Sequence, residues 1–281
     1  MMDEKTLRSA EQLFEMAFTE DIGDGDITTN NLIPPDSNKT AIFVAKEEGI
    51  IAGLPVTEMV FKKFDKHLIW NEILPDGSKV SPGDIIAEFK GNYRALLTGE
   101  RKALNFLQRL SGIATYANKC IQAVEGFHVE ILDTRKTTPG YRFLDKYAVR
   151  VGGASNHRFG LYDMVMIKDN HIQVAGSIKN AVKSIRSKIP KSIKIEVETS
   201  NMEQIREAIE ADVDIIMLDN MNSKMMKEAV KLINKRTKIE ASGNMTLKRI
   251  RKVAATGVDY ISIGALTHSI KALDISQRII D

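Results

Sequence analysis

The second half of this chain repeats one unit, and that repeat limits the folds that the chain can adopt. A short apolar run is followed by a polar residue or glycine, a turn and an amphipathic helix. The runs follow one another at roughly 20 to 35 residues, which suits βα units, and near-continuous apolar runs predict strands buried on both faces of a parallel sheet. The six runs are residues 129–132, 164–167, 193–197, 215–218, 239–241 and 260–263. The sequence therefore predicts an α/β domain built on a parallel sheet.

The residue after each apolar run can bind or polarise a ligand, or let the backbone approach one. In chain order these residues are Asp133, Lys168, Glu198, Asp219, Ser242 and Gly264. Each stands at the carboxyl end of its predicted strand, where βα barrels build their active sites. Strands also end on polar residues for structural reasons, which accounts for one or two such positions. Six in register, with both signs of charge, favour a binding site.

A group of cations occupies the turns around the first two of these strands. Arg135, Lys136, His157, Arg158, Lys168 and His171 lie within about 40 residues, most of them beside Gly, Ser, Thr or Asn. Such cations are typical of a site for a small molecule that carries several phosphates or carboxylates. No partner set at the spacing of a zinc site accompanies the histidines. An anion contact is expected for His157, whereas a structural role and a functional role both stay open for His171.

The first 112 residues have a different pattern and are expected to form a separate domain. An opening amphipathic helix leads into an acidic, glycine-rich loop at residues 20–29, which lacks the ligand spacing of a calcium loop and is interpreted as a turn that starts a strand. Short antiparallel strands are predicted at residues 40–45, 49–52, 78–80 and 84–89, and a long helix at 96–112. The predicted domains are residues 1–112 and 113–267, with the segment 268–281 packing back onto the first.

Composition excludes several classes of protein. The formal net charge is only +3 over 281 residues and 6% of the residues are aromatic, so neither a nucleic-acid-binding protein nor a membrane-surface protein is indicated. Cys120 is the only cysteine, which rules out an internal disulfide and a cysteine-rich metal site. The N-terminal sequence has no apolar signal core, and no apolar run is long enough to span a membrane. A cytoplasmic enzyme of small anionic substrates is expected.

The chain resembles the quinolinate phosphoribosyltransferase family along nearly its whole length. The residues that carry the resemblance are 20–29, 100–115, 133–171, 195–198, 217–220, 240–244 and 261–267. The resemblance implies an N-terminal α/β sandwich domain joined to an incomplete parallel βα barrel. It also implies a transferase of NAD biosynthesis that converts quinolinate and phosphoribosyl pyrophosphate to nicotinate mononucleotide, CO₂ and pyrophosphate, with Mg²⁺.

The resemblance further implies which residues bind the substrates. These are Arg101, Thr134, Arg135, Lys136, His157, Arg158, Lys168, Glu198, Asp219, Ser242, Gly243, Asn244 and Gly264, with Lys136, Lys168, Glu198 and Asp219 in catalytic roles. Quinolinate is a dicarboxylate and the sugar donor carries a phosphate and a pyrophosphate. Several cations are therefore needed to bring the two anions together. Arg135 and Arg158 are expected on the quinolinate carboxylates.

The two acids of this set are expected to face the sugar donor. Glu198 and Asp219 would meet the ribose hydroxyls and the Mg²⁺-bound edge of the donor, and no separate protein metal site is expected. The turn residues of the last two strands would present backbone amides to a phosphate. Arg101 matches a family arginine that reaches the site from a neighbouring subunit, so a homodimer is expected, and assembly of dimers into a hexamer stays open.

Two other functions stay open at this point. One is a paralogue on the same scaffold that acts on a different base or anion, and the other is an anion-binding barrel without catalysis. Retention of the whole set of cations favours the carboxylating transferase over the paralogue. Glu198 and Asp219 argue against simple anion binding, because two acids in an anion site would weaken it.

Overall fold

The structure is a computed structural model that describes residues 2–281. It contains two compact units, which alternate along the chain. The first unit is formed by the residues up to 118 together with residues 137–153 and 267–281, and the second by residues 119–136 and 154–266. Each unit has its own sheet.

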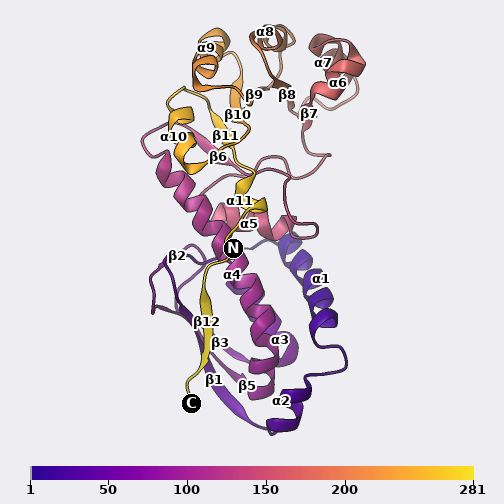
Figure 1. The fold of residues 1–281 in the computed structure, drawn as a ribbon. Coiled ribbons are helices and arrows are strands. Elements are labelled where there is room, and N and C mark those ends of the chain that lie inside the picture. Colours follow the sequence, from indigo (N-terminus) through magenta and orange to yellow (C-terminus); the bar gives the residue numbers. More distant parts are fainter. Residues whose placement is uncertain (1) are drawn as a thin grey trace. The chain divides into compact units, whose positions relative to one another are not determined.

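The first unit is built on a four-stranded antiparallel sheet (Figure 1). The sheet order is β12 (Ile275–Ile279), β1 (Asn38–Ala45), β5 (Ile85–Asn92) and β3 (Ile69–Glu72), and β2 (Gly49–Ile50) pairs separately with β4 (Lys79–Val80). The last strand of the chain thus pairs with the first, from Ala41 opposite Ile279 to Ala45 opposite Ile275. The helices that begin in this unit are α1 (Glu4–Asp21), α2 (Ile27–Leu32), α3 (Leu54–Phe64), α4 (Tyr93–Ala123) and α5 (Arg142–Val151).

Aromatic side chains fix α3 on this sheet. Phe61 of α3 lies with its ring centroid 4.8 Å from that of Phe89 on β5, and Phe43 on β1 lies 4.8 Å from Phe89 as well. Trp70 on β3 stacks on Phe89 at 5.2 Å. The three phenylalanines are almost fully buried, so they supply much of the apolar area that holds this unit together.

Two local predictions for this part of the chain were wrong or incomplete. The acidic loop at residues 20–29 starts a helix and not a strand, because the Asp26 carboxylate accepts from the backbone N–H of Thr29 at 2.9 Å and so caps α2. The helix predicted at 96–112 continues to Ala123. α3 and β3 had not been predicted.

Gly112 in α4 lies against the backbone of residue 271, and its lack of a side chain is required there. A Cβ atom at Gly112 would lie only 2.2 Å from the carbonyl oxygen of Lys271. We therefore expect Gly112→Ala to lower the free energy of unfolding by about 2 kcal/mol, although alanine is normally the better helix residue. Denaturant unfolding tests this. Lys119→Ala, at an exposed position of the same helix, serves as the control and should change stability by less than about 0.5 kcal/mol.

The second unit is a six-stranded parallel sheet covered by helices. The order is β6 (Glu130–Leu132), β11 (Tyr260–Ser262), β10 (Lys238–Ser242), β9 (Ile215–Asp219), β8 (Ile195–Thr199) and β7 (Val165–Ile167). The six predicted strands are therefore confirmed. β6 and β7 stand at the two ends of the order and do not pair with each other, so the barrel is incomplete, as expected.

The helices of the second unit alternate with these strands. They are α6 (Asp169–Ala175), α7 (Ile178–Arg186), α8 (Met202–Glu210), α9 (Ser223–Ile233), α10 (Leu247–Ala254) and α11 (Ala265–His268). Figure 1 shows α7, α8 and α9 in a row on the outer side of the sheet. In residues 2–281 no helix combines the length and the apolar character that a membrane crossing requires.

Candidate active site

A cavity of about 420 Å³ opens at the carboxyl ends of the six parallel strands. Its lining comes from the six strands, from the turns that follow them and from the loop that precedes β7: Thr134, Arg135, Lys136, His157, Arg158, Met166, Lys168, Glu198, Met217, Asp219, Glu240, Ser242 and Ser262. Alternate residues of a strand face the same side of a sheet, so Met217 and Asp219 both face the cavity, as do Glu240 and Ser242. Asp219 and Ser242 are also register partners. The structure thus brings nine of the thirteen predicted binding residues into one place.

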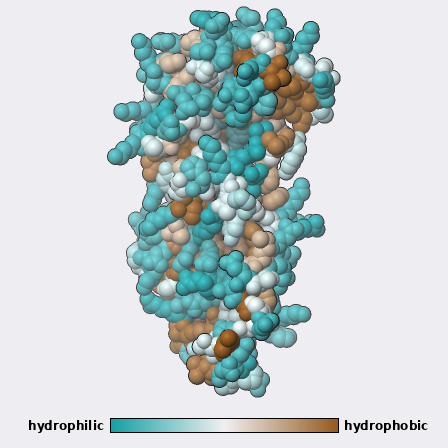
Figure 2. All heavy atoms as spheres, turned by 45° about the vertical axis from the view of Figure 1, so that its right-hand side comes forward, coloured by the Kyte–Doolittle hydropathy of each residue, from teal (hydrophilic) through white to brown (hydrophobic). Residues whose placement is uncertain are grey.

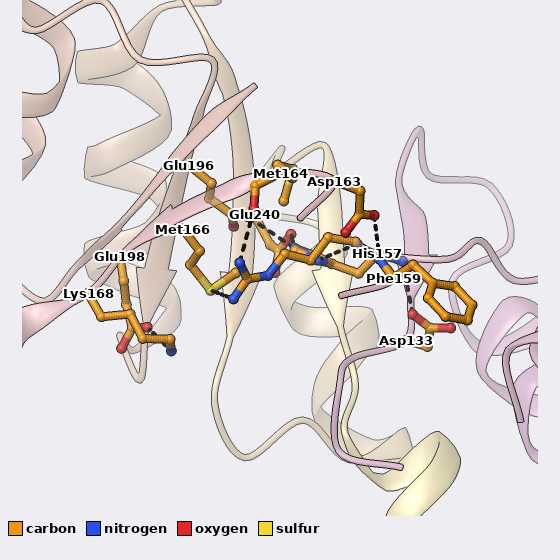
Figure 3. Close-up of polar contacts among 11 residues, drawn as sticks. Asp133, His157, Phe159, Asp163, Met164, Met166, Lys168, Glu196, Glu198 and Glu240 are labelled. Atoms are coloured by element: carbon orange, nitrogen blue, oxygen red, sulfur yellow. Dashed lines mark hydrogen bonds and ion pairs between the residues drawn. The ribbon is translucent and has the colours of Figure 1, made fainter. Parts of the chain in front are cut away.

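Lys168 and Glu198 form an ion pair at the mouth of the cavity. The distance from Lys168 Nζ to Glu198 Oε2 is 2.7 Å, and the two side chains are 45% and 22% exposed (Figure 3). The Lys168 backbone N–H donates to His171 Nδ1 at 2.9 Å at the start of α6. His171 therefore has a structural role in fixing the turn that carries Lys168.

Two guanidinium groups face the same space. The Arg158 side chain is held from behind, because Nη1 donates to the Met164 carbonyl oxygen at 3.0 Å and Nη2 lies 3.7 Å from Met166 Sδ. Burial, and next the nearby charge of Arg135, lower the pKa of Arg158. Like charges this close in a part-buried cavity are stabilised by an anionic ligand, which is what the sequence predicted for these two residues.

Asp133 does not act as a ligand-binding residue, contrary to the prediction for the residues that follow the strands. Its side chain is fully buried. One carboxylate oxygen accepts from the His157 backbone N–H at 2.9 Å, and the other accepts from Asn156 Nδ2 at 2.7 Å. Asp133 therefore fixes the loop that carries His157 and Arg158.

His157 lies between two buried acids, Glu196 and Glu240, that sequence reasoning had missed. Its Nε2 is 3.0 Å from Glu196 Oε2 and 3.2 Å from Glu240 Oε2, and the backbone N–H of Arg158 donates to its Nδ1 at 2.7 Å (Figure 3). Both ring nitrogens thus face protein groups. His157 also lines the cavity, and its contact with an anion stays a prediction. The alternation of Glu196, Val197 and Glu198 within an otherwise apolar strand is the signal that could have revealed the inner acid.

Burial and charge shift the pKa values of Glu196 and His157 in this cluster. Burial raises the pKa of Glu196 to about 7, although the His157 N–H opposes the rise. Burial disfavours the charged imidazole, but the two carboxylates outweigh burial and raise the pKa of His157 to about 10. The hydrogen bond that Nδ1 accepts from the Arg158 backbone N–H works against this rise, because a charged imidazole would need a second proton on that nitrogen and would lose the bond. The ring therefore carries a single proton. The proton of the ring is therefore placed on Nε2, toward the acids.

Four predicted site residues lie outside the lining of this cavity: Arg101, Gly243, Asn244 and Gly264. Gly243 and Asn244 form the turn after β10, with positive φ angles of 92° and 51°. A Cβ atom at Gly243 would lie 2.2 Å from Asn220 Oδ1, so glycine is required for this turn to pass the neighbouring one. Arg101 is exposed on α4 and belongs to the first unit.

An apolar groove of about 940 Å³ continues from the cavity, with which it shares Arg135, Arg158, Met166 and Lys168. Leu161 and Val174, which are 74% and 91% exposed, also line it. Figure 2 shows this face of the molecule as mostly hydrophilic, with hydrophobic atoms gathered at the upper right of the view and again at its lower end. Large apolar side chains this exposed beside a site are typical of an interaction surface.

Both parts of the chain match models of one protein family. Residues 26–111 match the N-terminal domain of quinolinate phosphoribosyl transferase, and residues 113–278 match its C-terminal domain. A relative from Synechocystis sp., named as a probable nicotinate-nucleotide pyrophosphorylase [carboxylating], is 48% identical over 93% of this chain and 89% of its own length. A Bacillus subtilis relative of the same name is 46% identical over 95% and 92%.

Solved structures agree with this match. NadC from Streptococcus pyogenes superimposes with a TM-score of 0.93 at 40% identity, covering 98% of both chains. The nicotinate-nucleotide pyrophosphorylase from Francisella tularensis superimposes with a TM-score of 0.94, also at 40% identity, covering 97% of this chain and 96% of that one.

Proposed function

Because the chain belongs to the quinolinate phosphoribosyl transferase family, we propose that it is a cytoplasmic enzyme of NAD biosynthesis that joins quinolinate to phosphoribosyl pyrophosphate. The products are nicotinate mononucleotide, CO₂ and pyrophosphate. One observation carries the proposal: four cations, Arg135, Lys136, Arg158 and Lys168, line one cavity together with the acids Glu198 and Asp219. A cavity with both charge signs suits two anionic substrates of which one also presents hydroxyl groups.

The cations bring two anions together against their mutual repulsion. Arg135 and Arg158 bind the two carboxylates of quinolinate, because a guanidinium group matches a carboxylate with two parallel hydrogen bonds. Lys136 and Lys168 are point charges on the same wall and bind the phosphate groups or hold the ring through its carboxylates. Holding both reactants in one orientation accounts for much of the rate increase.

Glu198 and Asp219 act on the sugar donor. Their carboxylates accept hydrogen bonds from the ribose hydroxyls and stabilise the positive charge that grows at the anomeric carbon as pyrophosphate leaves. Carboxylate oxygens also suit Mg²⁺, which would enter with the pyrophosphate and neutralise part of its charge. The partly exposed carboxylates of Glu198 and Asp219 fit an ion that arrives with the substrate.

The chemistry needs no protein base to activate the acceptor. The lone pair of the quinolinate ring nitrogen forms the bond to the anomeric carbon, and the bond to pyrophosphate breaks. The ring nitrogen then carries a positive charge, so the adjacent carboxylate can leave as CO₂ with its electron pair left on the ring carbon. That carbon takes up a proton, and nicotinate mononucleotide results.

We also propose a homodimer in which Arg101 completes the site of the partner subunit. The cavity is lined by the second unit alone, whereas Arg101 lies on α4 in the first unit. The exposed apolar groove beside the cavity supports a partner surface at this place. A hexamer would be an assembly of such dimers.

The reaction is tested with purified protein, Mg²⁺ and phosphoribosyl pyrophosphate, offered quinolinate or nicotinate in parallel. We expect mononucleotide from quinolinate and little from nicotinate, because nicotinate lacks the second carboxylate and leaves a cation of the cavity unpaired. Equal turnover of the two acids would contradict the proposed specificity. Turnover of neither would indicate a paralogue with another acceptor.

A further inference from the structure

Two buried acids lie behind the cations of the cavity, and the proposed reaction makes no direct use of them. Glu196 on β8 and Glu240 on β10 are fully buried, and both carboxylates lie within 3.2 Å of His157 Nε2. Burying a carboxylate costs several kcal/mol unless it is paired and hydrogen-bonded. Because two such acids around one imidazole lower the stability of the fold, we expect them to have a function that offsets this cost.

The geometry at His157 argues against a metal in this cluster. The three possible ligand atoms lie within 4.8 Å of one another, which is close enough for one ion. A metal on Nε2 would need the ring proton on Nδ1, since a neutral imidazole carries one proton. The backbone N–H of Arg158 already points at Nδ1 from 2.7 Å. The proton is therefore on Nε2 and faces the two carboxylates. A protonated Nε2 has no lone pair with which to bind a metal.

We propose that Glu196 and Glu240 are positioning residues that orient Arg158 for quinolinate through the ring of His157. In this arrangement the two carboxylates, whose Oε2 atoms lie 3.0 and 3.2 Å from Nε2, would take up its proton between them and so fix the ring. Nδ1 accepts the Arg158 backbone N–H. At its other end the Arg158 guanidinium donates to the Met164 carbonyl oxygen at 3.0 Å. Arg158 is thus fixed at its backbone and at its head group.

This inference rests on the proposed function, in which Arg158 binds a carboxylate of quinolinate. A guanidinium group makes two parallel hydrogen bonds to a carboxylate only in a narrow range of orientations. If the acids no longer accept the Nε2 proton, the ring and the Arg158 backbone can turn. Quinolinate binding then weakens, whereas the binding of phosphoribosyl pyrophosphate, which meets other residues, does not.

Two double variants separate the hydrogen bonds from the charge. Glu196→Gln with Glu240→Gln keeps the length of both side chains and one acceptor oxygen on each. Glu196→Met with Glu240→Met keeps the length alone. Both variants lose the same charges. We expect the methionine variant to raise the KM for quinolinate at least about tenfold and the glutamine variant by no more than about threefold. The KM for phosphoribosyl pyrophosphate should stay within about threefold in both.

The outcomes distinguish this inference from the proposed function. Equal KM values for quinolinate in the two double variants would overturn the positioning role, and so would a parallel rise of both KM values in the methionine variant. Arg158→Ala, measured alongside, must raise the KM for quinolinate. If it does not, the assigned role of Arg158 in the proposed function fails instead. Thermal melting checks that each variant folds. If the double methionine variant does not fold, the single variants Glu240→Met and Glu240→Gln are compared in the same way.

Discussion

Lys168→Ala is expected to lower kcat/KM for quinolinate at least about 100-fold, a loss of about 3 kcal/mol in transition-state stabilisation. Lys168 Nζ lies 2.7 Å from Glu198 Oε2 at the mouth of the cavity. The substitution removes one cation that binds the anionic substrates. It also leaves the Glu198 carboxylate without this partner, and an uncompensated negative charge repels both substrates. Steady-state kinetics with each substrate varied in turn measure the effect.

Lys238→Ala is the matched control for this prediction. Lys238 forms a similar ion pair, with its Nζ 2.6 Å from Asp259 Oδ1, but it begins β10 at the amino end of the sheet, away from the cavity. Exposed ion pairs of this kind contribute little to stability, so kcat/KM should stay within about twofold of the unsubstituted enzyme. Near-normal turnover in Lys168→Ala, or an equal loss in both variants, would show that Lys168 has no role in the site.

Heterodimers of two inactive variants are expected to regain about half of the activity of the unsubstituted dimer. One protomer carries Arg101→Ala and its partner carries Lys168→Ala. If Arg101 acts in the partner's site, one of the two sites combines an intact Lys168 with an intact Arg101, and the other site lacks both. Co-expression with two different affinity tags, followed by tandem purification, isolates the heterodimer. Its turnover is compared with that of each homodimer.

The control heterodimer pairs Lys168→Ala with Arg135→Ala. These two residues line the same cavity of one chain, so each site of this heterodimer lacks one of them and activity should stay at the level of the homodimers. Recovery in the control, or no recovery with Arg101→Ala, would contradict a site completed by the partner subunit.

The sequence predicted the sheet and much of the cavity because both follow from simple local rules. Apolar runs at βα spacing identify the parallel strands, and the residue after each run identifies the carboxyl edge of the sheet. Lys168, Glu198, Asp219 and Ser242 all line the cavity at that edge. Each of these residues lies in a strand or directly after one. Its position at the edge of the sheet therefore follows from the local sequence, without knowledge of contacts that are distant in sequence.

The positions that were missed depend on contacts that are distant in sequence. Asp133 follows a strand like the others, yet its carboxylate accepts a hydrogen bond from the backbone of His157, 24 residues further on. Glu196 and Glu240 lie two residues before the predicted site residues of their strands, on the same face, and become a cluster only when β8 and β10 converge on His157. In the first unit, the cap that Asp26 provides decided between a strand and a helix.

The stoichiometry of the reaction tests the central claim most directly. Quinolinate labelled in the carboxylate next to the ring nitrogen is incubated with phosphoribosyl pyrophosphate, Mg²⁺ and the enzyme, and labelled CO₂, mononucleotide and pyrophosphate are counted together. A carboxylating pyrophosphorylase, working in the direction of nicotinate mononucleotide, should release one CO₂ and one pyrophosphate for each mononucleotide formed. Mononucleotide that retains the label, or CO₂ released without pyrophosphate, would contradict the proposed reaction.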